Sequence, residues 1–87
     1  IAIAPHDCTG PVSLAVAGHV ITAIPNGLVQ EVSRAFYHGW YQDVAAGLPI
    51  IDAGELALAD HAGHGVSLRA DMLNRPGTTR RVTDFTS

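Results

Sequence analysis

The feature that most constrains this 87-residue chain is a helix that is apolar over most of its circumference. The spacing of apolar residues predicts this helix over Pro11–Ala23, ended by the strong breaker Ile24-Pro25-Asn26-Gly27. Two adjacent faces are apolar and carry Val12, Ala15, Val16, His19, Val20 and Ala23, then Leu14, Ala17 and Ile21. Because such a helix has almost no polar face for water, we expect it to pack between other elements of a larger body.

A short apolar run precedes this helix, and another follows it. Ile1–Ala4 and Leu28–Val32 are predicted to be strands, and a strand, helix and strand with short connections form a unit of a parallel sheet. His6 then follows the first strand, and Glu31 lies near the end of the second. Both belong to the rim where α/β enzymes carry their catalytic groups. With strands roughly 4.8 Å apart, the two side chains can face one ligand.

These three elements cannot bury their own apolar surface. A two-stranded parallel pair with one helix leaves a sheet face and two edges open. The chain also begins on a strand and without a methionine, so we expect it to be the tail of a larger protein. In isolation, the 87 residues are expected to aggregate or to stay molten.

The remaining residues predict shorter elements. Ser33–Gly47 is expected to be partly helical or loop, and its aromatic residues are expected to pack against a neighbouring element, with a pocket lining as the alternative. Leu48–Ala59 is expected to form a hairpin that turns at Asp52-Ala-Gly54. Beyond it we expect a turn at Gly63–Gly65, a strand at Val66–Leu68, a helical turn at Ala70–Leu73 and an edge strand at Arg81–Thr83 in a polar tail.

Composition limits the classes of function. The chain is 47% hydrophobic, which argues against disorder, and its net charge of −3 argues against nucleic-acid binding. It has no lysine, so a lysine base or Schiff base must come from elsewhere. The longest apolar stretch, Val12–Ile24, is too short and too polar to span a bilayer, and no charged start indicates a signal peptide. We expect a cytoplasmic protein with no membrane partner.

The single cysteine, Cys8, excludes an internal disulfide and suits a reducing compartment. A nucleophilic role needs a base partner and a lowered pKa, and the spacing from His6 fixes no geometry for one. We therefore expect Cys8 to be a packing residue.

The residues alone leave the roles of the rim side chains open. His6 can transfer protons near neutral pH, or it can be a turn histidine bonded to a backbone carbonyl. Glu31 can donate to an oxyanion if an apolar pocket keeps it protonated, or it can pair with Arg34. Asp7 is expected to cap the helix rather than to orient His6, and Thr9 is expected as the N-cap residue.

One further cluster suggests metal binding. His61, His64 and Asp60 are a candidate zinc site, but they surround two glycines and offer no third ligand at a fixed spacing. A solvated loop is the favoured interpretation. His19, on an apolar helix face, is expected to be a core or interface histidine.

The motifs occur in an order that is informative as a set. They resemble the C-terminal part of the mandelate racemase/muconate lactonizing group of the enolase superfamily, and among its members the acid-sugar dehydratases. The resemblance covers essentially the whole chain through Pro5-His6-Asp7, Gly10-Pro11, a small-residue helix, Pro25-Asn26, Gln30-Glu31, Asp52-Ala-Gly54 and Gly63-x-Gly65.

The resemblance implies an α/β fold, namely the C-terminal part of a modified (β/α) barrel of the TIM type with an α+β capping domain. Residues 1–47 would supply the last two βα units of the barrel, with its seventh and eighth strands. Residues 48–87 would return to the capping domain. The rest of the barrel would belong to the same polypeptide, and a homo-oligomer is expected.

The resemblance also implies a function. Enzymes of this family abstract the proton α to a carboxylate and stabilise the enediolate on Mg²⁺. His6 matches the histidine that ends the seventh strand, which is a general acid in the dehydratases and a base in the racemases. Glu31 matches the glutamate that ends the eighth strand, which binds the carboxylate or enediolate of the substrate. An acid-sugar dehydratase is therefore predicted, with a racemase or epimerase of a 2-hydroxy acid, or a non-catalytic module, as alternatives.

Several parts of the family's site lie outside this chain. The three carboxylates that bind Mg²⁺, the lysine on the second strand and the aspartate that orients the histidine belong to earlier strands. The family's Pro-Gly-x-Gly turn is Ala62-Gly63-His64-Gly65 here. The isolated 87 residues are therefore predicted to be inactive.

Overall fold

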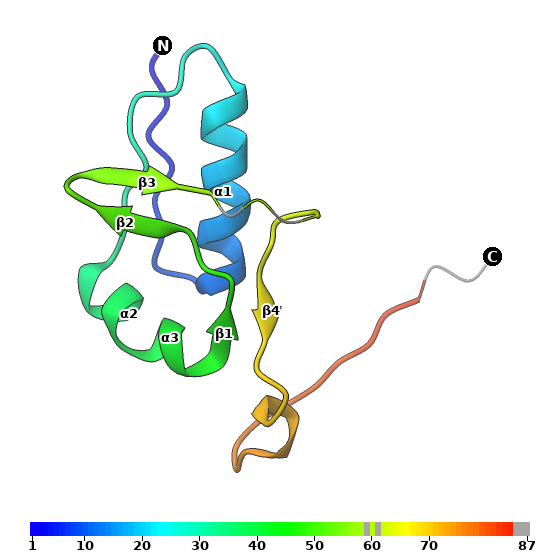
Figure 1. Cartoon of the computed structure of the whole chain (residues 1–87). Coiled ribbons are helices and arrows are strands. Elements are labelled where there is room, and N and C mark those ends of the chain that lie inside the picture. The colour runs from blue at the N-terminus through cyan, green and yellow to red at the C-terminus, as the bar shows by residue number, and fades with distance from the viewer. Residues whose placement is uncertain (59, 61, 85–87) are drawn as a thin grey trace.

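The structure is a computed structural model that describes residues 1–58, 60 and 62–84. Its longest element is α1 (Pro11–Ala23), which has the predicted bounds and begins with proline, whose fixed φ suits the first helical turn (Figure 1). Gly10 is the N-cap residue, and no side chain caps the helix. The prediction of Thr9 as the N-cap residue was therefore wrong.

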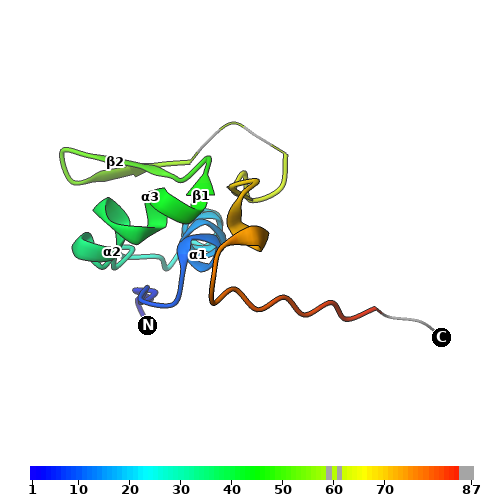
Figure 2. The same cartoon turned by 90° about the horizontal axis from the view of Figure 1, so that it is seen from below.

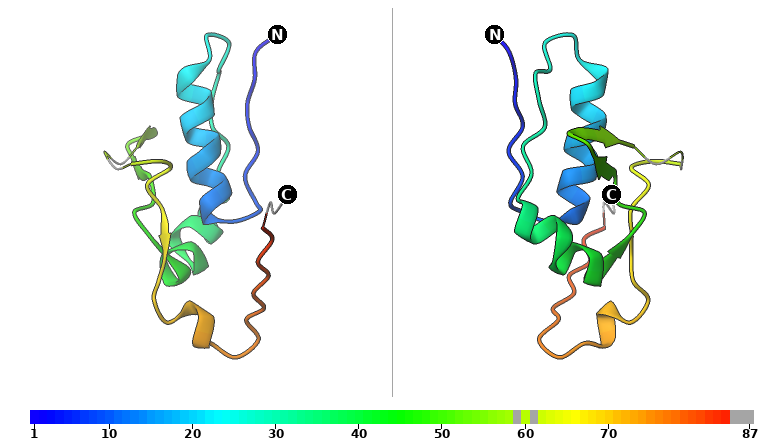
Figure 3. Two further views of the ribbon diagram at one scale, coloured as in Figure 1. Left: turned by 90° about the vertical axis from the view of Figure 1, so that its right-hand side faces the viewer. Right: turned by 60° about the vertical axis from the view of Figure 1, so that its left-hand side comes forward.

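The two predicted strands lie side by side in parallel, but only their centre has the pairing of a sheet. Ile3 and Gly27 form a single parallel bridge. The amide of Ile3 donates to the Asn26 carbonyl at 2.8 Å, and the amide of Leu28 donates to the Ile3 carbonyl, also at 2.8 Å. Figure 3 shows the two segments running together along α1. The parallel alignment is confirmed, although the segments are shorter as strands than predicted.

Two short helices follow in the aromatic stretch. α2 (Arg34–His38) and α3 (Trp40–Val44) are separated at Gly39. A Cβ at Gly39 would lie 2.5 Å from the Ala35 carbonyl oxygen, so only glycine fits this close approach. The expectation of partly helical structure is confirmed.

The C-terminal half contains two small antiparallel sheets. β2 (Ile50–Asp52) pairs with β3 (Glu55–Ala57), as the predicted hairpin requires. Its turn has positive φ at both central positions, 51° at Ala53 and 77° at Gly54, as a two-residue hairpin turn of type I′ requires. The second sheet pairs β1 (Ala45–Ala46) with β4 (Ser67–Leu68).

Beyond β4 the chain forms little regular structure. A 3₁₀ turn spans Met72–Asn74, close to the predicted helical turn at Ala70–Leu73. Residues 78–84 form neither helix nor strand and run away from the body of the molecule (Figure 1). The prediction of an edge strand at Arg81–Thr83 was wrong, because these residues pair with no strand among residues 1–58, 60 and 62–84.

The core lies on one side of α1. Leu14 packs with Tyr37 and Tyr41, and Ala15 packs with Ala45 and Val66. Figure 2 shows α1 between the N-terminal segment and the hairpin. On the rest of its surface, Val16 is 44% exposed and Val20 is 50% exposed. The prediction that other elements cover the whole helix is therefore met on one side only.

Within the described residues, none of the helices has the length and apolar character needed to cross a membrane.

Candidate functional site

The candidate site is formed by two segments that lie in parallel, residues 1–5 before α1 and residues 26–31 after it. His6 follows the first segment directly, and Glu31 stands near the end of the second. The Glu31 amide donates to the Pro5 carbonyl at 2.9 Å, and the Gln30 side-chain amide donates to the same carbonyl at 3.3 Å. These bonds fix the two chain segments against each other next to His6.

The two predicted side chains meet directly. Nδ1 of His6 lies 2.8 Å from Oε2 of Glu31. Both groups are open to solvent, with 67% of the His6 side chain and 53% of the Glu31 side chain exposed. The structure therefore brings the two candidate residues together on an accessible rim, and not in the apolar pocket that would keep Glu31 protonated.

The contact assigns different tasks to the two ring nitrogens of His6. A carboxylate accepts hydrogen bonds, so Nδ1 carries the proton that faces Glu31. Nε2 is then the ring nitrogen that remains for proton exchange with a ligand. Among the described residues, the ring makes its hydrogen bond through Nδ1 alone, which leaves Nε2 available to a ligand.

A buried pair lies next to this open one, and the sequence did not predict it. Asp7 is only 2% exposed, and its Oδ2 accepts a hydrogen bond of 2.8 Å from the hydroxyl of Tyr41, which is fully buried in α3. The prediction that Asp7 caps α1 was wrong, because the carboxylate is drawn into the core by Tyr41. No local sequence signal indicates this pair, because Asp7 and Tyr41 lie 34 positions apart.

Burial sets the protonation state of this tyrosine. Desolvation, and then the hydrogen bond to Asp7, raise the pKa of the Tyr41 phenol above its ordinary value. The phenol therefore stays protonated at neutral pH and acts as the donor in the pair.

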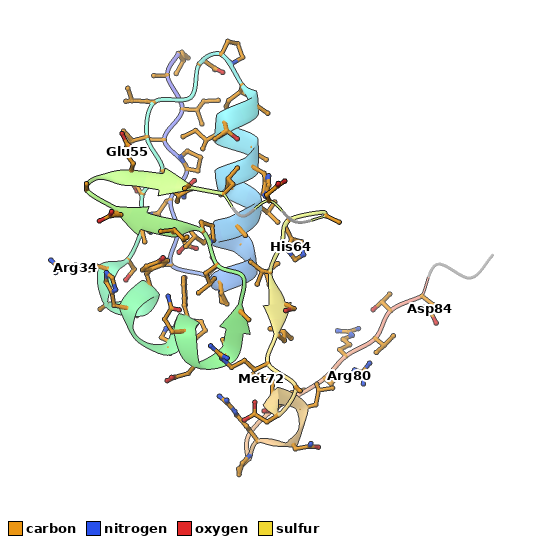
Figure 4. All side chains as sticks on the ribbon, viewed as in Figure 1. Arg34, Glu55, His64, Met72, Arg80 and Asp84 are labelled. Atoms are coloured by element: carbon orange, nitrogen blue, oxygen red, sulfur yellow. The ribbon has the colours of Figure 1, made fainter. Side chains whose placement is uncertain are left out.

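The alternative partner of Glu31 is not used. In the part of the chain that the structure describes, Glu31 pairs with His6 and makes no ion pair with Arg34. Figure 4 shows the Arg34 side chain pointing outward from α2.

The described residues contain no group of three or more histidine, cysteine, aspartate or glutamate side chains that could hold a metal ion. His61, part of the suggested zinc cluster, lies outside the described residues. His64 is part of a turn, where its Nδ1 accepts a 3.1 Å hydrogen bond from the Val66 amide (Figure 4). Cys8 is exposed, so the expectation of a buried packing cysteine was wrong.

His19 of α1 is partly buried, as expected of a core or interface histidine. Its Nε2 is shielded from water and has no hydrogen-bond partner within the described part of the chain. The same is true of Oε1 of Gln30. Neither atom belongs to the candidate pair.

Comparison with known proteins gives the site a family context. A D-xylonate dehydratase from Haloferax volcanii is 28% identical over 73 residues, which cover 84% of this chain and 18% of that protein. An enolase of the mandelate racemase subgroup from Agrobacterium tumefaciens is 42% identical, with a TM-score of 0.74 over 82% of this chain and 19% of that one. An enolase from environmental sequencing of the Sargasso Sea is 34% identical, with a TM-score of 0.77 over 87% and 20% of the two chains.

The chain thus spans about a fifth of the length of these relatives. The family model described as enolase C-terminal domain-like matches residues 1–72, and this match confirms the resemblance and the α/β class drawn from the motifs. The chain belongs to the enolase C-terminal domain-like family.

Proposed function

We propose that this chain is part of a lyase that removes water from a sugar acid, and that His6 and Glu31 are its contribution to the active site. The observation that carries the proposal is the 2.8 Å contact between the two side chains on one exposed rim. The similarity to a D-xylonate dehydratase supports a sugar acid as the substrate class. Because the chain spans about a fifth of that relative, the activity belongs to a longer protein.

The proposal includes a place in the fold. The parallel segments around α1 would form the last two βα units of a barrel, and residues 48–87 would join the capping domain. The single parallel bridge at Ile3 and Gly27 agrees with two neighbouring barrel strands. The exposed Val16 and Val20 agree with further elements of the barrel covering α1.

The chemistry proposed for His6 is that of a general acid. With Nδ1–H directed at Glu31, the protonated ring presents Nε2–H to the substrate. As the bond between the β-carbon and its hydroxyl breaks, Nε2 gives its proton to the departing oxygen, and water leaves. The enol that remains becomes a keto acid. The base that removes the α-proton would lie outside this chain.

Glu31 would serve this reaction in two ways. Its Oε2 holds the tautomer and the direction of the His6 ring. Its second oxygen can accept a hydrogen bond from a substrate hydroxyl, a group that sugar acids carry in number. A direct bond to the substrate carboxylate would require a protonated Glu31.

Magnesium does not fit the described residues as a resident ion of this chain, because they offer no cluster of three ligating side chains. Binding of Mg²⁺ by residues outside the chain is part of the proposal. The steps assigned to His6 and Glu31 depend on their own atoms alone.

The decisive experiment replaces His6 in the complete protein that carries this chain. His6→Asn keeps a polar side chain of similar size but cannot transfer a proton. We expect keto-acid formation from D-xylonate and related sugar acids to fall roughly 100- to 10,000-fold, the range for general acid–base groups. His38→Asn, at an exposed histidine of α2, is the matched control and should keep full activity.

Full activity of His6→Asn would refute the role of this residue. The racemase alternative is tested in the same assay run in deuterated water. Incorporation of deuterium at the α-carbon without loss of water would establish racemisation and not dehydration.

A further inference from the structure

The buried pair of Asp7 and Tyr41 has no part in the chemistry proposed above. The pair is nevertheless next to the candidate site, because Asp7 directly follows the candidate acid His6. Aspartate is almost never fully buried unless it is paired. Here its partner comes from α3, 34 positions further along the sequence, and the two oxygens lie 2.8 Å apart.

The pair anchors one side of the turn that carries His6. On the other side, the Pro5 carbonyl accepts hydrogen bonds from the Glu31 amide and the Gln30 side chain. His6 therefore stands between two fixed neighbours, while its own ring is exposed and has Glu31 as its contact. The direction of an exposed ring depends on the backbone that carries it.

We propose, on the basis of the function proposed above, that Asp7 and Tyr41 are positioning residues that set the direction of the His6 ring relative to Glu31 and the substrate. The hydroxyl of Tyr41 fixes the Asp7 carboxylate inside the core. The backbone between Asp7 and Pro5 is then held at both ends, which leaves the His6 side chain a narrow range of directions.

The hydroxyl is the part of Tyr41 that this role requires. Its ring packs with Leu14 and would still do so in a phenylalanine. Oδ1 of Asp7 is already buried without a hydrogen-bond partner among the described residues, so loss of the Tyr41 hydroxyl would leave the whole carboxylate unpaired. An unpaired buried carboxylate moves toward water, and the turn moves with it.

Tyr37 provides a matched control for this substitution. It is 8% exposed, packs in the same cluster, and donates its hydroxyl to the Pro49 carbonyl at 2.6 Å. Tyr37→Phe therefore removes one buried hydroxyl from the same core without touching the His6 turn. Any effect of Tyr41→Phe that Tyr37→Phe does not share comes from the contact with Asp7.

The test compares these variants in the complete protein with D-xylonate and related sugar acids as substrates. For Tyr41→Phe we expect kcat to fall about 10- to 100-fold, since a displacement of about 1 Å costs roughly that factor, while KM stays within about threefold. Tyr41→Phe and Tyr37→Phe should lower the melting temperature by similar amounts. Tyr37→Phe should leave kcat unchanged. Asp7→Asn keeps an oxygen that accepts from Tyr41, and it should retain kcat within about threefold.

A second readout does not depend on turnover. Histidine labelled at Cε1 gives an NMR signal for His6, which the His6→Asn variant assigns. Tyr41→Phe should shift or broaden this signal, and Tyr37→Phe should not. If no sugar acid is converted, the proposed function fails, and the signal still decides whether the pair holds the ring.

Two results would overturn the proposal. One is equal kcat and an unchanged His6 signal in Tyr41→Phe and Tyr37→Phe. The other result applies also if Tyr41→Phe does not fold. It is a fall of kcat beyond about 10-fold in Asp7→Asn with an unchanged His6 signal. That result would show that turnover depends on the charge of Asp7 and not on its hydrogen bond to Tyr41.

Discussion

The first segment, residues 1–32, and the later segment, residues 33–68, differ in how far they bury their apolar side chains. Of the six buried apolar residues in the described part of the chain, the later segment supplies four, Tyr37, Tyr41, Ala45 and Val66. The first segment supplies only Leu14 and Ala15, both from one side of α1. Six of its other large aliphatic residues are exposed, namely Ile1, Ile3, Val16, Val20, Leu28 and Val29. The remaining four, Val12, Ile21, Ile24 and Val32, are half-buried.

The candidate catalytic pair lies in the first segment, residues 1–32. The buried tyrosine that pairs with Asp7 lies in the later segment, residues 33–68. His6 and Glu31 stand at the end of a short parallel pairing, whose bridge joins Ile3 and Gly27. Asp7 connects this rim to α3, where Tyr41 is enclosed by aromatic packing. The exposed pair and the buried Asp7 are therefore neighbours in sequence, but only Asp7 contacts the well-packed later segment through its side chain.

The largest expected effect on stability comes from the buried side of α1. Leu14→Ala removes a fully buried side chain that packs against Tyr37 and Tyr41. We expect it to lower the free energy of unfolding of the complete protein by about 2–5 kcal/mol, measured by denaturant titration. A loss below about 1 kcal/mol would show that this core is not the one that forms in the complete protein.

Val20→Ala is the matching substitution on the exposed side of α1. At 50% exposure the residue contributes little within this chain alone. If barrel elements cover α1, the substitution should cost about 1.5 kcal/mol in the complete protein, at about 0.8 kcal/mol for each buried methylene-sized group. A cost near zero would contradict the placement in a barrel.

Both segments contain elements that the sequence predicts from local signals. α1 follows from local signals, because an apolar spacing, a proline at its start and Pro25-Asn26-Gly27 at its end all agree. The hairpin follows from the turn at Ala53-Gly54 in the same way. The shared rim of His6 and Glu31 follows from the order of strand, helix and strand.

The remaining features depend on contacts between distant residues. The pairing of Asp7 with Tyr41 depends on where α3 packs, and no local pattern encodes that position. The local chemistry of Asp7 and Thr9 predicted a helix cap, but the tertiary contact with Tyr41 takes Asp7 into the core. The strands at both sides of α1 were predicted too long, because their pairing is limited to the single bridge between Ile3 and Gly27.

A smaller effect is expected at alkaline pH from the raised pKa of Tyr41. The unfolded chain loses this phenolic proton near pH 10, whereas the folded chain retains it to higher pH. The stabilisation from the protonated phenol is therefore complete below pH 10 and decreases as the pH rises, by up to about 1.4 kcal/mol per pH unit.

The difference in unfolding free energy between wild type and Tyr41→Phe isolates this contribution. We expect the difference to be constant from pH 7 to pH 9 and to decrease between pH 10 and pH 12, as followed by denaturant titration. Tyr37→Phe serves as the control for alkaline effects elsewhere in the protein. A difference that stays constant up to pH 12 would contradict a protonated, buried Tyr41.

The smallest effect on stability is expected at the site itself. Glu31→Gln keeps the shape of the side chain but removes the charge that faces His6, and both partners are largely exposed. Exposed ion pairs contribute about 0–1 kcal/mol, so the free energy of unfolding should change by less than about 0.5 kcal/mol. Activity should nevertheless fall, because an amide can present its NH₂ group as well as its oxygen to Nδ1, so it no longer fixes the tautomer and direction of the His6 ring. A stability loss of about 3 kcal/mol or more, the range for breaking a buried ion pair, would contradict an exposed rim and show that other elements cover Glu31.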